Sequence, residues 1–109
     1  MKHKSKKYTY YRGIGVKVIR TTYQNNGRTA VVMYPKNHPD MHQIITVNLD
    51  DGLEWGPEYA YLDTNNLPGI EECMMESGLA VPTGMYCRSG YCRYPLFKFD
   101  LSKIPEMKL

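Results

Sequence analysis

The sequence predicts a small α+β domain, in which five to six antiparallel strands form a sheet beside one short helix. Three observations support this class. Apolar and polar residues alternate through much of the chain, turn residues separate the alternating segments, and a single stretch has helical periodicity. With 109 residues, 42% of them hydrophobic and 23% charged, the chain has the length and composition of one globular domain. We expect residues 1–7 to be a basic flexible tail and residues 8–109 to be the domain.

The first two strands are expected to form a hairpin. Residues 8–23 are rich in β-branched and aromatic side chains, which is typical of a strand. The Asn-Asn-Gly sequence at 25–27 tolerates positive φ and predicts a tight turn. The chain then returns as a strand over 28–34, and Pro35 ends it because proline cannot donate a hydrogen bond to a neighbouring strand.

The middle of the chain predicts two further strands. After a polar loop at 36–41, residues 43–49 have apolar side chains on both faces and read as one strand. A turn at 50–52 leads to a stretch that holds the only tryptophan, and residues 58–62 alternate as a short strand.

Residues 68–77 form the one expected helix. Its apolar residues recur at i, i+3 and i+4, so they share one narrow face. An asparagine at 65 or 66 is expected to cap its first turn, and Gly78 is placed to end it in a left-handed conformation. The apolar face consists of Ile70, Cys73 and Met74.

Residues 85–99 predict a last hairpin with Ser89 and Gly90 at its tip. In that register Cys87 lies opposite Cys92 with Cα atoms about 4.5 Å apart, at the short end of the disulfide range. A disulfide across the hairpin is therefore allowed but not required. An odd number of cysteines in a chain without a secretory signal favours reduced thiols and a cytoplasmic location.

Charge is strongly segregated along the chain, although the net charge is only +3. Residues 1–36 contain nine basic and no acidic side chains, residues 37–87 nine acidic and no basic ones, and residues 88–109 five basic and two acidic ones. Opposite charges that pair across neighbouring strands would produce this pattern. Alternatively, folding gathers acidic side chains on one face that meets a basic partner. The residues assigned to that contact face are Asp50, Asp51, Glu54 and Glu58.

The basic N-terminal segment supports a second hypothesis, a small nucleic-acid-binding module. Lysines contact phosphates without reading sequence, and tyrosines stack on unpaired bases. The same lysines would also serve solubility alone. The residues assigned to nucleic-acid contact are Lys4, Lys6, Lys7, Tyr8, Tyr10 and Arg12.

Neither a cofactor nor a catalytic centre is predicted. His38, Asp40 and His42 lie within five residues and could ligate a divalent metal, but a polar loop carries the same residues for solubility, so no metal is assigned. No serine or cysteine stands beside a base in the sequence pattern of a nucleophile, so we expect a binding protein rather than an enzyme. No apolar stretch has the length of a membrane helix, and the oligomeric state does not follow from the sequence.

Four sequence blocks stand in a fixed order in the second half of the chain. They are TVNL at 46–49, LDTNNLPGIEE at 62–72, GLAVPTG at 78–84 and SGYCRYPLFKFDL at 89–101. These blocks resemble an uncharacterised domain-of-unknown-function family of small proteins carried on conjugative elements, plasmids and prophages of gut bacteria.

The resemblance implies a mobile-element accessory protein in the cytoplasm of a bacterial host, and it supplies no catalytic residues. Small proteins in that setting often antagonise host defences such as restriction or RNA-guided nucleases. The function expected is therefore binding and inhibition of a host defence protein, of the anti-CRISPR or anti-restriction type. The expected partner is a basic, nucleic-acid-binding protein, which an acidic face complements.

Overall fold

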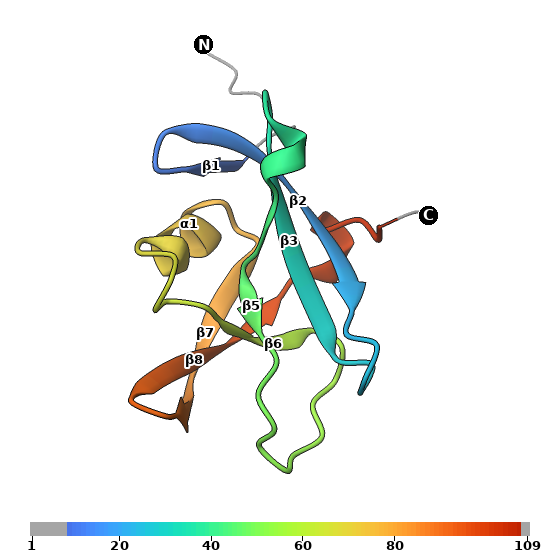
Figure 1. Cartoon of the computed structure of the whole chain (residues 1–109), viewed down its shortest axis with the longest axis vertical. Helices are drawn as coiled ribbons and strands as arrows, with labels where there is room; N and C mark the ends of the chain where they lie inside the picture. Colours follow the sequence, from blue (N-terminus) through green and yellow to red (C-terminus); the bar gives the residue numbers. More distant parts are fainter. Residues whose placement is uncertain (1–8, 108–109) are drawn as a thin grey trace.

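The computed structural model describes residues 9–107. Within them, eight strands form two antiparallel sheets of four, and one α-helix packs against the sheets (Figure 1). In the first sheet the order is β1-β2-β3-β4, and in the second it is β5-β6-β8-β7. The α+β class is confirmed, with more strands than the five to six expected and with two sheets in place of one. The strands are β1 (Thr9–Tyr11), β2 (Ile14–Thr22), β3 (Thr29–Pro35), β4 (Gln43–Ile44), β5 (Thr46–Val47), β6 (Tyr59–Leu62), β7 (Ala80–Ser89) and β8 (Cys92–Phe99).

The chain passes from the first sheet to the second at Ile45. The expected single strand over 43–49 is two short strands, because β4 pairs with β3 while β5 pairs with β6. At the crossing, the Ile45 amide donates to the Val31 carbonyl at 2.8 Å, and the Ile45 carbonyl accepts from the Asp63 amide at 2.9 Å. Ile45 is fully buried, so the bend lies inside the molecule.

The segment expected as one strand over 8–23 is a hairpin. Arg12 and Gly13 turn the chain with φ angles of 52° and 83°, and β1 folds back on the start of β2. Only glycine adopts such a conformation without strain, so the backbone at Arg12 is strained. The next hairpin follows the prediction, since β2 and β3 pair through seven positions across the turn at 25–27.

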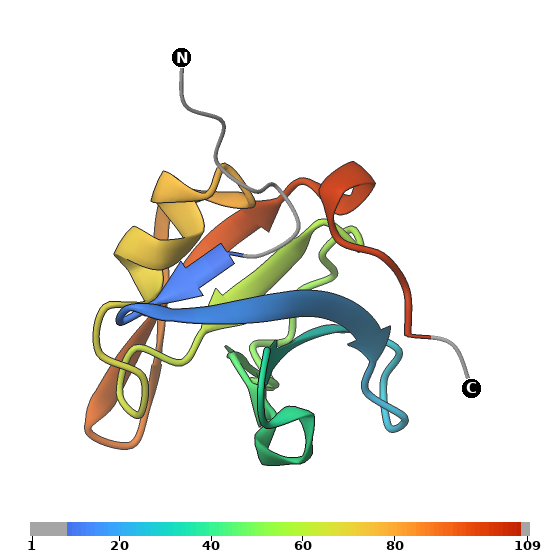
Figure 2. The ribbon, with the colours of Figure 1, turned by 90° about the horizontal axis from the view of Figure 1, so that it is seen from above.

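Helix α1 (Ile70–Glu76) contacts both β1 and β7 and so covers the main core between the two sheets (Figure 2). Gly78 ends the helix with a φ of 74°, as predicted. The expected asparagine cap is wrong, because Gly69 precedes the helix and no side chain caps it. Asn66 instead bonds through its backbone and side-chain amides to the Asp63 carboxylate, at 3.1 and 2.9 Å.

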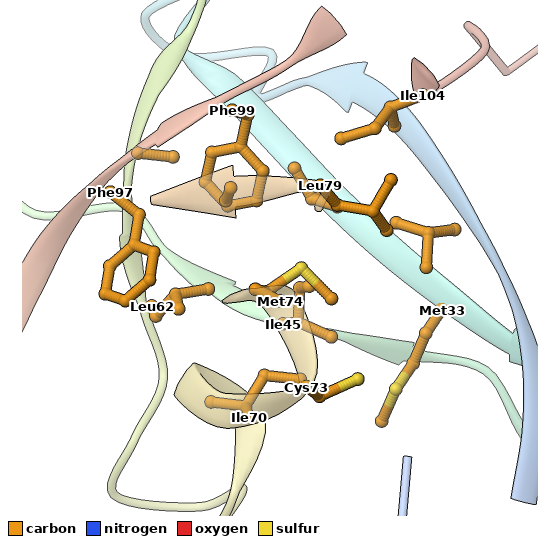
Figure 3. Close-up of a cluster of buried hydrophobic side chains, with 14 of the residues drawn as sticks. Met33, Ile45, Leu62, Ile70, Cys73, Met74, Leu79, Phe97, Phe99 and Ile104 are labelled. Atoms are coloured by element: carbon orange, nitrogen blue, oxygen red, sulfur yellow. The ribbon is translucent and has the colours of Figure 1, made fainter. Parts of the chain in front are cut away.

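The main core fills the space between the sheets, the helix and the C-terminal segment (Figure 3). Both sheets contribute one face, and the predicted apolar face of the helix completes the core. The C-terminal segment is hydrogen-bonded to Arg20 in β2. The Arg20 amide donates to the Pro105 carbonyl at 2.9 Å, and the Arg20 carbonyl accepts from the Met107 amide at 2.8 Å. The largest fully buried side chains are Phe97, Ile45, Leu62, Ile70, Met74, Leu96, Ile104 and Val31.

The β7–β8 hairpin has a register different from the one expected. Ser89 pairs with Cys92, so Gly90 and Tyr91 form the tip, and Cys87 lies opposite Tyr94. The two cysteines are thus diagonal rather than directly opposite, and diagonal neighbours are about 7–8 Å apart, beyond ordinary disulfide geometry. The structure holds both as free thiols, and the expected register that placed Cys87 opposite Cys92 is wrong.

Candidate functional site

The loop at 48–58 joins β5 to β6 and covers the face of the second sheet that is turned away from the main core. In Figure 1 this loop is drawn in light green at the bottom of the molecule. Leu49 packs with Tyr61 and Leu96 in a second small core, against which Trp55 is partly buried. A compact surface loop with neighbouring ends and its own packed side chains is a frequent carrier of function.

Asp51 is the anchor of this loop. Its carboxylate accepts from the Arg28 guanidinium at 2.7 Å, from the Trp55 indole at 2.8 Å and from the Tyr61 hydroxyl at 2.6 Å. The Leu53 amide donates a fourth bond at 2.9 Å. The Asp51 side chain is 5% exposed, against 21% for Arg28, so this is a largely buried ion pair with every carboxylate oxygen bonded.

Arg28 fixes the loop at two further points. It immediately precedes β3, and its guanidinium also donates to the carbonyls of Leu49, at 2.8 Å, and Leu53. The turn before β3 adds a second attachment, since the Asn48 side-chain amide donates to the Asn25 carbonyl oxygen and its own oxygen accepts from the Asn26 amide, both at 3.0 Å. One hairpin of the first sheet therefore determines the path of a loop in the second.

The electrostatics of the site follow from these bonds. Burial alone would raise the pKa of Asp51, but the hydrogen bonds from Arg28, Tyr61, Trp55 and the Leu53 amide outweigh it and hold that pKa well below its usual range. Burial and the adjacent carboxylate raise the pKa of Tyr61 well above its ordinary value. At neutral pH the carboxylate is therefore charged, and the tyrosine is a neutral donor.

The four residues assigned to an acidic contact face lie in different surroundings. Asp50 and Glu54 are exposed on the loop, whereas Asp51 is turned inward to Arg28, which corrects its assignment as a contact residue. Glu58 is half-buried at the end of the loop, where it lines an open hollow of about 570 Å³ together with Lys98 and Asp100.

Other acidic residues lie on separate parts of the surface. Asp40 belongs to a 3-10 turn, η1 (Pro39–Met41), which Figure 1 places at the end of the molecule opposite the 48–58 loop. Glu71 and Glu72 lie in the first turn of α1. The acidic middle third of the sequence thus does not form one continuous face.

The residues assigned to nucleic-acid contact are only partly described. Lys4, Lys6, Lys7 and Tyr8 lie outside residues 9–107. Tyr10 in β1 is 59% exposed, and Arg12 is exposed in the turn that follows.

The sequence at 38–42 does not assemble a metal site. Among the residues that the structure describes, no group of three His, Cys, Asp or Glu side chains is placed to hold a metal ion. His42 instead stacks on Tyr34, with ring centroids 5.2 Å apart. No helix within residues 9–107 is long and apolar enough to cross a membrane.

Arg28, Trp55 and Tyr61 are the site residues that sequence reasoning missed. The one available signal was the position of the only tryptophan, four residues after Asp51. Nothing local distinguishes Arg28 from the other basic residues of its segment, because it meets Asp51 only through the tertiary fold.

The fold and the loop define a small two-sheet α+β domain with a surface loop anchored by a buried ion pair. The chain belongs to the family described as Domain of unknown function (DUF4313), whose model matches residues 17–108. This confirms the domain-of-unknown-function membership expected from the sequence blocks, and the family description names no enzymatic activity. Comparisons with curated proteins and with solved structures give no match.

Proposed function

We propose that this protein is a non-enzymatic binding module that captures a basic, nucleic-acid-binding protein through its 48–58 loop. The observation that carries the proposal is the anchoring of the loop by Asp51, which leaves Asp50, Leu53 and Glu54 exposed. A loop that is ordered before binding loses little conformational entropy on association. Two carboxylates on either side of an exposed leucine complement a basic groove with an apolar floor.

The mobile-element setting implied by the sequence blocks supplies the class of partner in this proposal. Restriction enzymes and RNA-guided nucleases hold nucleic acid in positively charged channels. An acidic loop that occupies such a channel excludes the nucleic acid by competition, and inhibition then needs no chemistry. The partner is accordingly a host defence protein, met in the bacterial cytoplasm.

The proposal divides the four acidic residues by their surroundings. Asp50 and Glu54 contact the partner directly, and Asp51 acts as a positioning residue that holds the loop between them. Glu58 faces its own hollow beside Lys98 and is assigned no direct contact.

The test compares two charge reversals of equal size. Protein is used to capture its partner from host lysate with and without nuclease treatment, and the affinity of the purified pair is then measured. Asp50→Lys with Glu54→Lys should weaken binding at least tenfold, or about 1.4 kcal/mol, because attraction to the basic groove becomes repulsion. The matched control, Glu72→Lys with Glu76→Lys on α1, should change the affinity less than threefold.

Both variants should retain the thermal stability of the parent, because all four side chains are exposed. Equal losses from loop and helix variants, or a capture that disappears on nuclease treatment, would overturn the proposal.

A further inference from the structure

The β7–β8 hairpin extends past the main core as an arm. Residues 81–86 of β7 are all exposed, including Val81, Met85 and Tyr86 at 56%, 49% and 51%. Figure 1 shows its tip at the lower left, away from the helix and from the first sheet. From 77 to 99 the sequence contains three basic residues and no acidic one.

Two of these basic residues face each other across the strands. Arg88 pairs directly with Arg93, and like charges in opposite positions of an antiparallel pair destabilise it. Within residues 9–107 no carboxylate forms an ion pair with either arginine, since the ion pairs there involve Arg20, Arg28 and Lys103. The arm therefore carries two adjacent positive charges that no carboxylate of the described residues neutralises.

Aromatic rings lie beside the arginines on the arm. The Arg93 guanidinium sits 4.3 Å from the centroid of the Tyr86 ring. Tyr86 and Arg88 are two residues apart in β7 and share one face, whereas Cys87 on the other face packs towards the second core. Tyr91 at the tip is completely exposed.

We propose that this face of the hairpin arm binds single-stranded nucleic acid. Arg88 and Arg93 contact successive phosphates, and the anion removes the repulsion between them. Tyr91 offers a free ring face for stacking on an unpaired base, and Tyr86 with its bound guanidinium extends the platform. Exposed rings interleaved with arginines favour a single strand over an acidic protein or a duplex, because only a single strand presents both phosphates and unstacked bases.

The test uses the full chain and a fluorescent oligothymidine in an anisotropy titration at about 50 mM salt. Arg88→Gln with Arg93→Gln should weaken binding at least tenfold. Its control, Lys17→Gln with Lys103→Gln, removes the same charge from other surfaces and should weaken binding less than threefold. The slope of log affinity against log salt should fall by about 1.4 in the arginine variant, since each phosphate contact on a single strand contributes about 0.7.

A second pair of variants tests stacking. Tyr91→Leu should weaken binding about fivefold or more, whereas Tyr91→Phe, which keeps the ring, should stay within about twofold. Thermal unfolding verifies that each variant remains folded.

Several results would overturn the proposal: equal losses from the arginine and lysine pairs, no effect of Tyr91→Leu, or competition by polyglutamate as strong as that by unlabelled oligothymidine. Binding that vanishes only with Lys4→Gln, Lys6→Gln and Lys7→Gln would assign the nucleic-acid contact to the N-terminal segment instead. Because the titration needs no partner protein, its failure leaves the loop proposal standing, and the reverse also holds.

Discussion

The 48–58 loop and the outer half of the β7–β8 hairpin are held in opposite ways. The loop has no regular secondary structure, yet hydrogen bonds to the Asp51 and Arg28 side chains fix its path. The hairpin is held by backbone pairing between β7 and β8, with a register shift between Pro82 and Tyr86, yet residues 81–86 are exposed. Backbone pairing between strands and tertiary anchoring by side chains are thus independent properties in this protein.

The same comparison separates two uses of charge. In the loop, a carboxylate and a guanidinium meet at 2.7 Å and stabilise the fold. On the arm, Arg88 and Arg93 lie opposite each other with no carboxylate partner within residues 9–107. A charged side chain that is paired within the fold cannot also pair with a partner. A charged side chain that is left unpaired, and that destabilises the fold, can pair with one.

The largest effect is expected from Asp51→Asn. An amide cannot accept from Arg28, Trp55 and Tyr61 together, and it leaves a largely buried guanidinium without its counter-charge. Stability should fall by about 3 kcal/mol. Trp55 is the only tryptophan, so its emission should shift to the red as the loop loosens. Asp50→Asn, which is exposed, is the control and should stay within about 0.5 kcal/mol. Equal stability of the two variants would contradict the anchoring role.

The pH dependence of the loop gives the next effect. The pKa of Asp51 is lower in the folded chain than in the unfolded one, so its contribution is complete at neutral pH and is lost as pH falls below about 4 through the folded pKa. The stability gap between the parent and Asp51→Asn should therefore narrow on acidification, as measured by urea unfolding at several pH values. A gap that stays constant down to about pH 3 would show that the charge is not its source.

Thiol reactivity sharpens the contrast between the arm and the core. Burial, with Glu76 nearby, raises the pKa of Cys73 to about 11, so it should react only after unfolding. Cys87 and Cys92 are half-buried and should react in the native protein. Because Cys87 packs against the second core, Asp51→Asn should accelerate Cys87 and leave Cys92 unchanged. The rate of thiol modification is measured, and the reaction of each cysteine is identified by its absence from the corresponding Cys→Ser variant. A fast reaction of Cys73 in the native protein would contradict its burial.

The smallest effect is expected from Arg88→Glu. It converts the opposed Arg88–Arg93 pair into an attractive one and should raise stability by a few tenths of a kcal/mol, up to about 0.5. Thermal unfolding measures the change, and Arg88→Gln should give a smaller increase. A destabilised Arg88→Glu would mean that the arginines do not repel each other in the folded arm.

The larger errors in prediction concerned strand pairing, and two local ones concerned the asparagine cap of α1 and the turn at Arg12 and Gly13. The turn at 25–27 and the helix end at Gly78 were predicted because turn chemistry acts within a few residues. The split of 43–49 at Ile45 was missed because an alternating pattern does not show which sheet a strand joins. In the last hairpin a one-residue change in the tip moved Cys87 from Cys92 to Tyr94.

By itself, the sequence determined the α+β class, the helix with its buried face and the segregation of charge, because periodicity and composition are properties of neighbouring residues. Only the tertiary structure decided which charged side chains remain available to a binding partner. Asp51 and Asp50 are adjacent in one turn, yet the Asp51 side chain is largely buried because Arg28, 23 residues away, is brought to it by the β2–β3 hairpin. Whether a charged side chain is buried depends on its contacts with distant segments, and no local pattern encodes these contacts.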